Sequence, residues 1–262
     1  MTRPFLLFIK QQALSCLFPV LVFILLGISH FFTGFIYRYD FMLIGCIIIQ
    51  AVLFFLKVET GDEVIVICVF HLLGLLMELF KVHIGSWTYP EYARTKFFGV
   101  PLYSGFMYAS VASYMCQAWR RFNLKLYNWP KHWAARVIGA LIYLNFFSNH
   151  FIIDVRYWIG LLILFFFRKT VVSFYIENKA YKMPVILSFL LIGFFIWLAE
   201  NVATRLGAWK YAYQHKTWAI VDYQKISSWS FLVIVSFIII TELKALKKKI
   251  DKPEKKHSPG VE

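Results

Sequence analysis

Long apolar stretches separated by short polar segments run along most of the chain. A run of roughly 20 apolar residues is long enough to cross the hydrocarbon core of a bilayer as an α-helix. Polar residues between Asn145 and Arg156 interrupt the fifth and sixth runs, where a tight hairpin or a re-entrant segment is the alternative. The pattern predicts eight transmembrane helices, at residues 13–32, 39–56, 64–80, 99–119, 134–149, 152–167, 183–201 and 226–243.

Composition leads to the same class of protein. Of the 262 residues, 60% are apolar and 16% are charged, whereas soluble domains average about 45–50% and 25%. We therefore expect an all-α membrane protein with one membrane domain over residues 1–243. The first apolar run lacks a cleavage signal and is expected to be a retained helix. No metal or cofactor is expected, and the cysteines are expected to pack as small apolar side chains: Cys16, Cys46, Cys68 and Cys116.

Basic residues predict the orientation of these helices. Of the 28 Lys and Arg residues, 19 fall on the side of the N-terminus and 9 on the other. The positive-inside rule therefore places both termini in the cytoplasm of a plasma-membrane protein. The tail at 244–262 holds seven lysines and is expected to be disordered. It serves either as a solvated end that fixes topology or as a contact for anionic lipid headgroups, and no nucleic-acid partner is expected.

One sequence pattern, E-x6-G-x-W-x-Y, occurs twice at a constant offset of 122 residues. It predicts an internal repeat, with four-helix halves at about 1–125 and 126–243. An even number of spans separates equivalent helices, so the halves have the same orientation and their site is expected between them. The shared positions are Glu78, Gly85, Trp87 and Tyr89 in the first copy and Glu200, Gly207, Trp209 and Tyr211 in the second.

The carboxylates of the repeated pattern are the catalytic candidates. Glu78 and Glu200 lie near the ends of apolar helices, where an ionised group costs several kcal/mol without a partner or water. The glycine that follows is expected to end each helix or to permit close approach of the backbone. In the structural alternative, Glu78 pairs with Lys81 and Glu200 with Arg205, and the aromatic residues only anchor the helix ends at the membrane interface.

Further polar and aromatic residues are candidates for substrate binding. His71 is seven residues before Glu78 and shares its helix face, and Asn145 and Asn149 share a face by i,i+4 spacing. A buried core histidine and helix-bridging asparagines are the alternatives. The sequence contains no nucleophile elbow, zinc-protease motif or Walker loop. The candidates for binding are His71, Trp87, Tyr89, Trp209, Tyr211, Asn145 and Asn149.

Taken end to end, the sequence resembles the YoaT-like bacterial membrane proteins, a family known only as a domain of unknown function. Residues 78–101, which read E-x6-G-x-W-x-Y-P and then F-F-G-V-P, are more distantly similar to carotenoid hydratases and membrane-type lycopene cyclases. That resemblance implies a small duplicated protein whose intramembrane carboxylates act on long polyenes, with Glu78 at the position of a hydratase acid. The paired-glutamate motif of the cyclases is missing, and the second copy has A-I-V-D in place of G-V-P.

These patterns together favour an intramembrane enzyme or binder for an isoprenoid or carotenoid-like lipid. Glu78 and Glu200 would face a cavity between the halves, where a carboxylic acid can protonate a double bond. The alternative is a small-solute transporter or channel with its site between the halves, because parallel duplication is known in transporters. A structural or partner-binding membrane protein is the third class, for which the sequence holds no motif.

Overall fold

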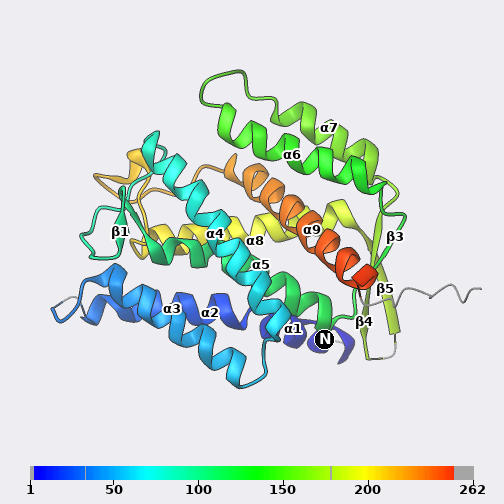
Figure 1. Cartoon of the computed structure of the whole chain (residues 1–262), viewed down its shortest axis with the longest axis horizontal. Helices are drawn as coiled ribbons and strands as arrows, with labels where there is room; N and C mark the ends of the chain where they lie inside the picture. The colour runs from blue at the N-terminus through cyan, green and yellow to red at the C-terminus, as the bar shows by residue number, and fades with distance from the viewer. Residues whose placement is uncertain (1–2, 33, 178, 251–262) are drawn as a thin grey trace, which may run out of the picture.

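A computed structural model describes residues 3–32, 34–177 and 179–250 and is mostly helical (Figure 1). The α-helices are α1 (Arg3–Ser15), α2 (Leu17–Ile28), α3 (Arg38–Phe55), α4 (Gly61–His83), α5 (Gly105–Arg121), α6 (His132–Ser148), α7 (Arg156–Phe167), α8 (Val185–Arg205) and α9 (Lys225–Ile250). Short 3-10 turns are η1 (Ser29–Phe32), η2 (Leu102–Ser104) and η3 (Ala212–Gln214). The strands are β1 (Lys96–Phe97), β2 (Val100–Pro101), β3 (Lys125–Tyr127), β4 (Val171–Ile176) and β5 (Lys179–Pro184).

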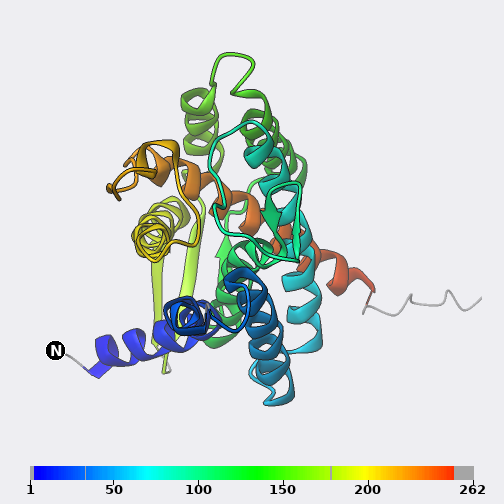
Figure 2. The same ribbon diagram turned by 90° about the vertical axis from the view of Figure 1, so that its left-hand side faces the viewer.

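The helices run between two ends of the molecule. At the sheet end lie β3, β4 and β5, and at the loop end lie the segments 84–104 and 206–224 (Figure 1). Helices α4 and α8 both run toward the loop end, and α5 and α9 both return from it (Figure 1). Figure 2 looks at the loop end and shows α2 and α8 nearly end-on, so these two helices are roughly parallel. Helices α4 and α8 therefore point the same way, as do α5 and α9 (Figure 1).

Four described helices are long and apolar enough to cross a membrane: α3, α4, α8 and the part of α9 up to Ala245. The number of candidate spans rises to five if the bent pair α1–α2 counts as one span. The four helices correspond to the predicted spans at 39–56, 64–80, 183–201 and 226–243. Helices α5 and α6 have 17 residues each and α7 has 12, shorter than the four candidate spans, which have at least 18. The described residues therefore support a multi-pass membrane protein, with fewer spans by length and composition than the eight predicted.

The predicted span at 13–32 is broken near its start. Helices α1 and α2 meet at Cys16 with a bend of 61°. Pro19 lies in the first turn of α2, where a proline is tolerated, but its ring lacks the N–H that would bond to the carbonyl of Ser15 and clashes with that carbonyl. The break therefore has a local cause in the sequence.

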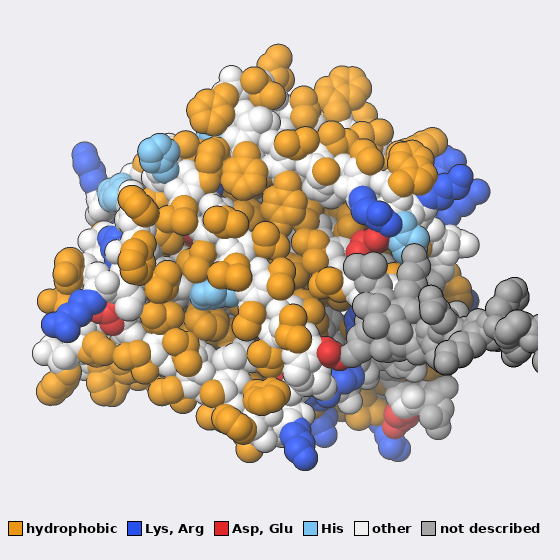
Figure 3. All heavy atoms as spheres, in the orientation of Figure 1, with side chains coloured by type: hydrophobic (Ala, Val, Ile, Leu, Met, Phe, Trp, Pro, Cys, Tyr) orange, Lys and Arg blue, Asp and Glu red, His pale blue; other side chains and the backbone are white. Residues whose placement is uncertain are grey.

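The surface is that of a protein surrounded by lipid. In the apolar windows of the four candidate spans, only 22% to 44% of the residues are buried inside the protein. Hydrophobic side chains cover most of the face in Figure 3, and few charged side chains lie across its middle. Exposed apolar areas of this extent are rare in soluble monomers, whereas bilayer lipid covers them without penalty.

A small antiparallel sheet stands where the sequence predicted only loops. Strand β4 pairs with β3 on one side and with β5 on the other, in the register Leu126↔Val172 and Phe174↔Tyr181. Val172 is buried, and the ring of Phe8 in α1 lies 5.8 Å from that of Phe174. The sheet thus closes the bundle at this end and ties α1 to the centre of the chain.

The helices that carry the two glutamates end in the same way. Gly85 after α4 and Gly207 after α8 have positive φ angles of 73° and 70°, a left-handed conformation that glycine adopts without steric cost. Each end has the hydrogen bonds of a Schellman motif, with Ser86 N donating to Lys81 O at 2.9 Å and Ala208 N to Ala203 O at 3.0 Å. After Gly85 and after Gly207, the chain turns into the loop end at equivalent points of the pattern.

Two clusters of buried apolar residues hold the bundle together. The larger lies mainly among α5 to α9, around side chains such as Ile138, Phe167 and Phe189. The second joins α2 and α3 to the loop end and includes Trp87 and Trp209. Helix α9 continues to Ile250, so the tail expected from residue 244 begins as helix, and residues 251–262 lie outside the described part of the chain.

Candidate functional site

Glu78 is buried in the penultimate turn of α4 and accepts three hydrogen bonds from side chains. Its donors are Trp87 Nε1 at 2.7 Å, Tyr89 OH at 2.8 Å and Tyr108 OH at 2.9 Å. Burial and the neighbouring Glu78 raise the pKa of Tyr89 well above its ordinary value, so this phenol stays protonated and can donate. Trp87 and Tyr89 belong to the repeated pattern, and Tyr108 comes from α5.

Glu200 occupies the matching place in α8 and is also buried. It accepts hydrogen bonds from Tyr211 OH at 2.5 Å and from Trp229 Nε1 at 2.6 Å. Burial and Glu200 raise the pKa of Tyr211 well above its ordinary value. In both copies the tyrosine of the pattern therefore binds its own glutamate, while a residue of the next helix, Tyr108 or Trp229, supplies another donor.

The loops that follow the two glutamates pair with each other directly. Thr88 N donates to Lys210 O and Lys210 N donates to Thr88 O, both at 2.9 Å, as an isolated antiparallel bridge. These two residues are 122 positions apart, at the same place in the two copies of the pattern. Trp87 also meets Tyr211 edge to face, with ring centroids 6.0 Å apart. The chain thus brings equivalent residues of both copies into contact.

Glu78 and Glu200 line one cavity of about 210 Å³. This is less than the roughly 300–1,000 Å³ typical of sites for drug-sized ligands, so the cavity can hold a small molecule or one end of a longer chain. Helices α4, α5, α6, α8 and α9 contribute to its wall. Seven residues singled out from the sequence line it: Glu78, Trp87, Asn145, Asn149, Glu200, Trp209 and Tyr211.

Two of the predicted residues lie outside the cavity lining. His71 packs against Phe106, with ring centroids 4.4 Å apart, and against the backbone at Gly105. His71 is half-buried and lies against α5 rather than in the cavity wall. Tyr89 touches the site only through its hydrogen bond to Glu78. Its contribution is to hold the carboxylate.

Asn145 connects the ends of α6 and α7 as well as lining the cavity. Its Nδ2 donates to Asp154 Oδ1 and its Oδ1 accepts from Val155 N, both at 3.0 Å. Asp154 in turn binds Arg156, with 2.5 Å between Oδ2 and Nε. The polar residues that interrupt the fifth and sixth predicted helices therefore close a hairpin, one of the two alternatives open from the sequence.

The ion pairs of the structural alternative are replaced by other contacts in the described structure. Lys81 Nζ donates to Phe146 O at 2.9 Å and lies 2.6 Å from His150 Nε2, while the Arg205 guanidinium stacks on Trp218 at 5.2 Å. Burial and the positive charge of Lys81 lower the pKa of His150, so its ring is neutral and can accept the bond from Lys81.

Comparison with known proteins places the chain in a family. The model of a family described as "Protein of unknown function (DUF817)" matches residues 4–237. The chain belongs to the DUF817 family. It is 53% identical over 240 residues to "Uncharacterized protein YoaT" of Bacillus subtilis (strain 168), a match that covers 91% of each chain. No solved structure matches. The resemblance to YoaT-like proteins is thereby confirmed, and the family description assigns no activity.

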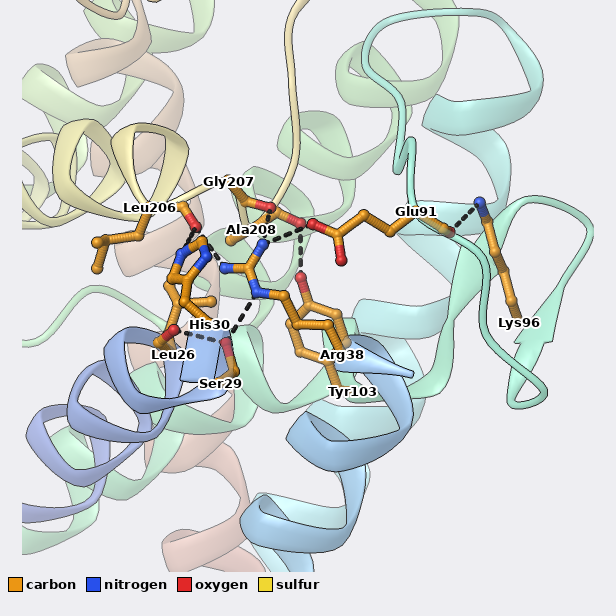
Figure 4. A network of polar contacts seen from close by, with 10 residues as sticks. All are labelled: Leu26, Ser29, His30, Arg38, Glu91, Lys96, Tyr103, Leu206, Gly207 and Ala208. Carbon is orange, nitrogen blue, oxygen red and sulfur yellow. Dashed lines mark hydrogen bonds and ion pairs between the residues drawn. The ribbon is translucent and has the colours of Figure 1, made fainter. Parts of the chain in front are cut away.

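The sequence of this DUF817 protein did not reveal the network that supports the loop end (Figure 4). The buried Arg38 guanidinium donates to Ser29 Oγ at 2.8 Å, to Glu91 Oε1 at 2.7 Å and to Gly207 O at 3.2 Å, and it also bonds to Leu206 O. These carbonyls form the C-terminal end of α8, which favours a nearby cation. Two of the four partners are backbone carbonyls, which every residue carries, so no spacing in the sequence signals this role.

Other polar side chains complete the same support. Tyr103 OH donates to Ala208 O at 2.6 Å, and His30 Nε2 lies 3.1 Å from Leu206 O. Residues from the first half thus hold the carbonyls of three successive residues just before Trp209 (Figure 4). Within the described residues, no group of three or more His, Cys, Asp or Glu side chains has the arrangement of a metal site.

We expect Arg38→Gln to destabilise the DUF817 protein by about 3 kcal/mol, because it leaves Glu91 and the buried carbonyls of α8 without their donor. Unfolding of the purified protein in mixed detergent micelles, followed by tryptophan fluorescence, measures this loss. Arg136→Gln is the matched control, since Arg136 is 65% exposed and pairs with Glu242 at the surface. Equal stability of the two variants would show that Arg38 does not hold the loop end.

Proposed function

We propose that this DUF817 protein is an intramembrane enzyme or binder for a hydrophobic lipid of the isoprenoid or carotenoid type. The observation that carries the proposal is the shared cavity, which Glu78 and Glu200 line together. Paired carboxylates inside an apolar bundle are expensive to bury and are usually functional. Here aromatic donors hold both of them in fixed positions at the cavity wall, which is the preorganisation that acid–base chemistry on a buried ligand requires.

The cavity wall suits a ligand that becomes positively charged during the reaction. A carboxylic acid at position 78 or 200 can give its proton to a carbon–carbon double bond, and its carboxylate then stabilises the cation. Aromatic faces attract such a cation, and two rings of this wall already contact the ammonium group of a lysine side chain. Lys225 Nζ lies 5.3 Å from the ring centroid of Trp87 and 4.8 Å from that of Tyr211. The distant likeness of residues 78–101 to carotenoid hydratases supports the same chemistry by analogy.

The proposal includes an internal duplication, with halves at about 1–125 and 126–243 around a pseudo-two-fold axis. Its support is the bridge between Thr88 and Lys210, the matched ends of α4 and α8 at Gly85 and Gly207, and the common direction of equivalent helices (Figure 1). An axis that passes through the bridge places the glutamates on opposite sides of one central site. Parallel duplication of this kind puts the ligand between the halves.

The first test compares lipids in strains that differ only in the two acids. We expect expression of the wild-type chain in a strain that lacks it to change the polyprenoid or carotenoid fraction of a total lipid extract, measured by mass spectrometry. Glu78→Gln and Glu200→Gln should each reduce this change roughly a hundredfold or more, as loss of a general acid does. The double variant should be little worse than either single variant, because residues that act as a unit are not additive.

Glu177→Gln serves as the control for expression, since Glu177 lies at the sheet end and pairs with the exposed Arg3. Additive effects of the two site variants would contradict a shared site. An unchanged lipid profile with the wild-type chain would remove the main reason to prefer lipid chemistry.

The second candidate function is transport of a small solute. The observation that favours it is the position of the cavity between two similarly directed helix pairs, α4–α5 and α8–α9. Transport needs water access to the site from both membrane faces, whereas a lipid enzyme needs an opening to the bilayer. The orientation of the helices decides which membrane face each loop contacts. We propose eight passes, with both termini in the cytoplasm because of the 19 to 9 division of basic residues.

Membrane-impermeant thiol reagents test access and orientation together, in a background without the four native cysteines. We expect Tyr92→Cys to react from the outside of intact cells and Lys131→Cys to react only after the membrane is opened. Glu78→Cys and Asn145→Cys should not react from the cytoplasmic side, and any reaction should come from the outside. Reaction of either cavity position from both faces would favour the transporter, and the reverse result at positions 92 and 131 would overturn the orientation.

A further inference from the structure

The cavity carries positive charge at the loop end. Lys81 lies in the last turn of α4, Arg156 is the first residue of α7 and Lys225 is the first residue of α9, and all three line the cavity. The helix ends that supply them gather at the same end of the molecule (Figure 1). Since Lys81 follows Glu78 by three residues on α4, it is about 4.5 Å further toward the loop end. The cations therefore form an outer layer and the carboxylates an inner one.

Within the described part of the chain, Lys81 and Lys225 have no counter-ion in contact with them. Among the described residues, no carboxylate oxygen lies within 4 Å of Lys81 Nζ or Lys225 Nζ. The polar neighbours of Lys81 are a carbonyl and the neutral ring of His150. The close neighbours of Lys225 are the rings of Trp87 and Tyr211. Lys81 is only 5% exposed, so its ammonium has lost most of its water without gaining a negative partner.

Glu78 and Glu200 do not act as counter-ions of Lys81 and Lys225 at close range. Aromatic O–H and N–H donors already occupy their oxygens. Lys225 is attracted to both glutamates and to Asp222 only at longer range, and Arg156 is paired with Asp154 through its Nε. Asp154 is not part of the cavity wall. The inner acids thus leave the outer layer positively charged.

The three cations also repel one another. The charge of Lys81 acts on both Lys225 and Arg156, and that of Arg156 acts on Lys225. Bringing like charges together in a partly desolvated cavity is unfavourable. Asn149 and Ser86 line the same cavity, and their side chains can add hydrogen bonds to the oxygens of that anion. A negatively charged group in the cavity would relieve the repulsion among the three cations.

We propose that Lys81, Arg156 and Lys225 form an anion subsite, which takes the phosphate or carboxylate group of an amphipathic ligand. This inference rests on the proposed function and narrows its substrate class. The apolar part of the ligand would extend past Trp87 and Trp209 toward the inner layer, where Glu78 and Glu200 reach it. The anion can come from a lipid headgroup or from free phosphate in water, and the two sources differ in whether an attached chain strengthens binding.

Calorimetric titration of the full-length protein in maltoside micelles, with geranyl phosphate, geraniol and inorganic phosphate as probes, tests the subsite. We expect geranyl phosphate to bind at least about tenfold more tightly than geraniol, because a charge-assisted contact is worth more than one factor of ten. Lys225→Gln and Arg156→Gln should each weaken geranyl phosphate about tenfold and leave geraniol unchanged. Lys225→Arg, which keeps the charge, should retain binding, and Lys216→Gln in an exposed loop is the control.

The possible outcomes distinguish a failure of the anion subsite from a failure of the proposed lipid-binding function. Equal affinity for geraniol and geranyl phosphate, unaffected by Lys225→Gln, would overturn the anion subsite and leave lipid binding intact. Inorganic phosphate that binds as tightly as geranyl phosphate and is lost in Lys225→Gln would support the subsite and assign it to a free anion, against the lipid substrate. Binding of none of the three probes would overturn both proposals. Circular dichroism of each variant shows whether it is folded.

Discussion

Burial of two carboxylates in an apolar helix bundle is the constraint on which the rest of this structure depends. Among the residues that the structure describes, no cation contacts Glu78 or Glu200, and both are instead surrounded by phenol and indole donors. Such donors combine an apolar ring, which packs among helices, with one polar atom that satisfies the acid. The requirement for these donors explains why a tyrosine follows each glutamate at a fixed distance, with Trp87 as a further donor in the first copy, and why the chain turns back at Gly85 and Gly207 to deliver them.

The same turns bring the two halves of the chain together. Once each loop folds back over its own glutamate, the residue between the tryptophan and the tyrosine is left at the surface of the turn, and there Thr88 meets Lys210. Arg38 and Tyr103 then fix the end of α8 from the side of the first half. The cavity is thus a consequence of how the acids are satisfied, since four of the five donors that hold them also line it, all but Tyr89.

Much of the bundle could be predicted from the sequence because long apolar runs and helix-ending glycines are local signals. Helices α3, α4, α8 and α9 lie close to their predicted positions. The effect of Pro19 on the first span is equally local, but the apolar residues on both sides of Pro19 favoured one continuous helix. Strand β5 could not be recognised because its sequence, K-A-Y-K-M-P, has the composition of a basic loop and gains its structure only by pairing with β4.

The site was predictable where the repeat marked it and unpredictable elsewhere. The repeated pattern singled out both acids and four aromatic residues, whereas Tyr108 and Trp229 donate from helices about 30 residues downstream and have no distinguishing neighbours in the sequence. His71 satisfied the helical spacing yet packs outside the cavity lining, because a shared helix face does not fix which neighbour covers it. Arg38 binds two backbone carbonyls, which every residue carries, and two side chains that no sequence pattern links to it.

The contact between Thr88 and Lys210 is the most direct point at which to test the account, because a shared cavity requires the two turns to meet. Residues that exchange both backbone hydrogen bonds have Cα atoms about 5.5 Å apart, within reach of a disulfide. In a background without native cysteines, the Thr88→Cys and Lys210→Cys double variant should form an intramolecular cross-link in nearly all molecules on mild oxidation, detected as a mobility shift after cleavage between the halves. Failure to cross-link, with both thiols reactive in the reduced protein, would contradict the convergence of the two copies on one site.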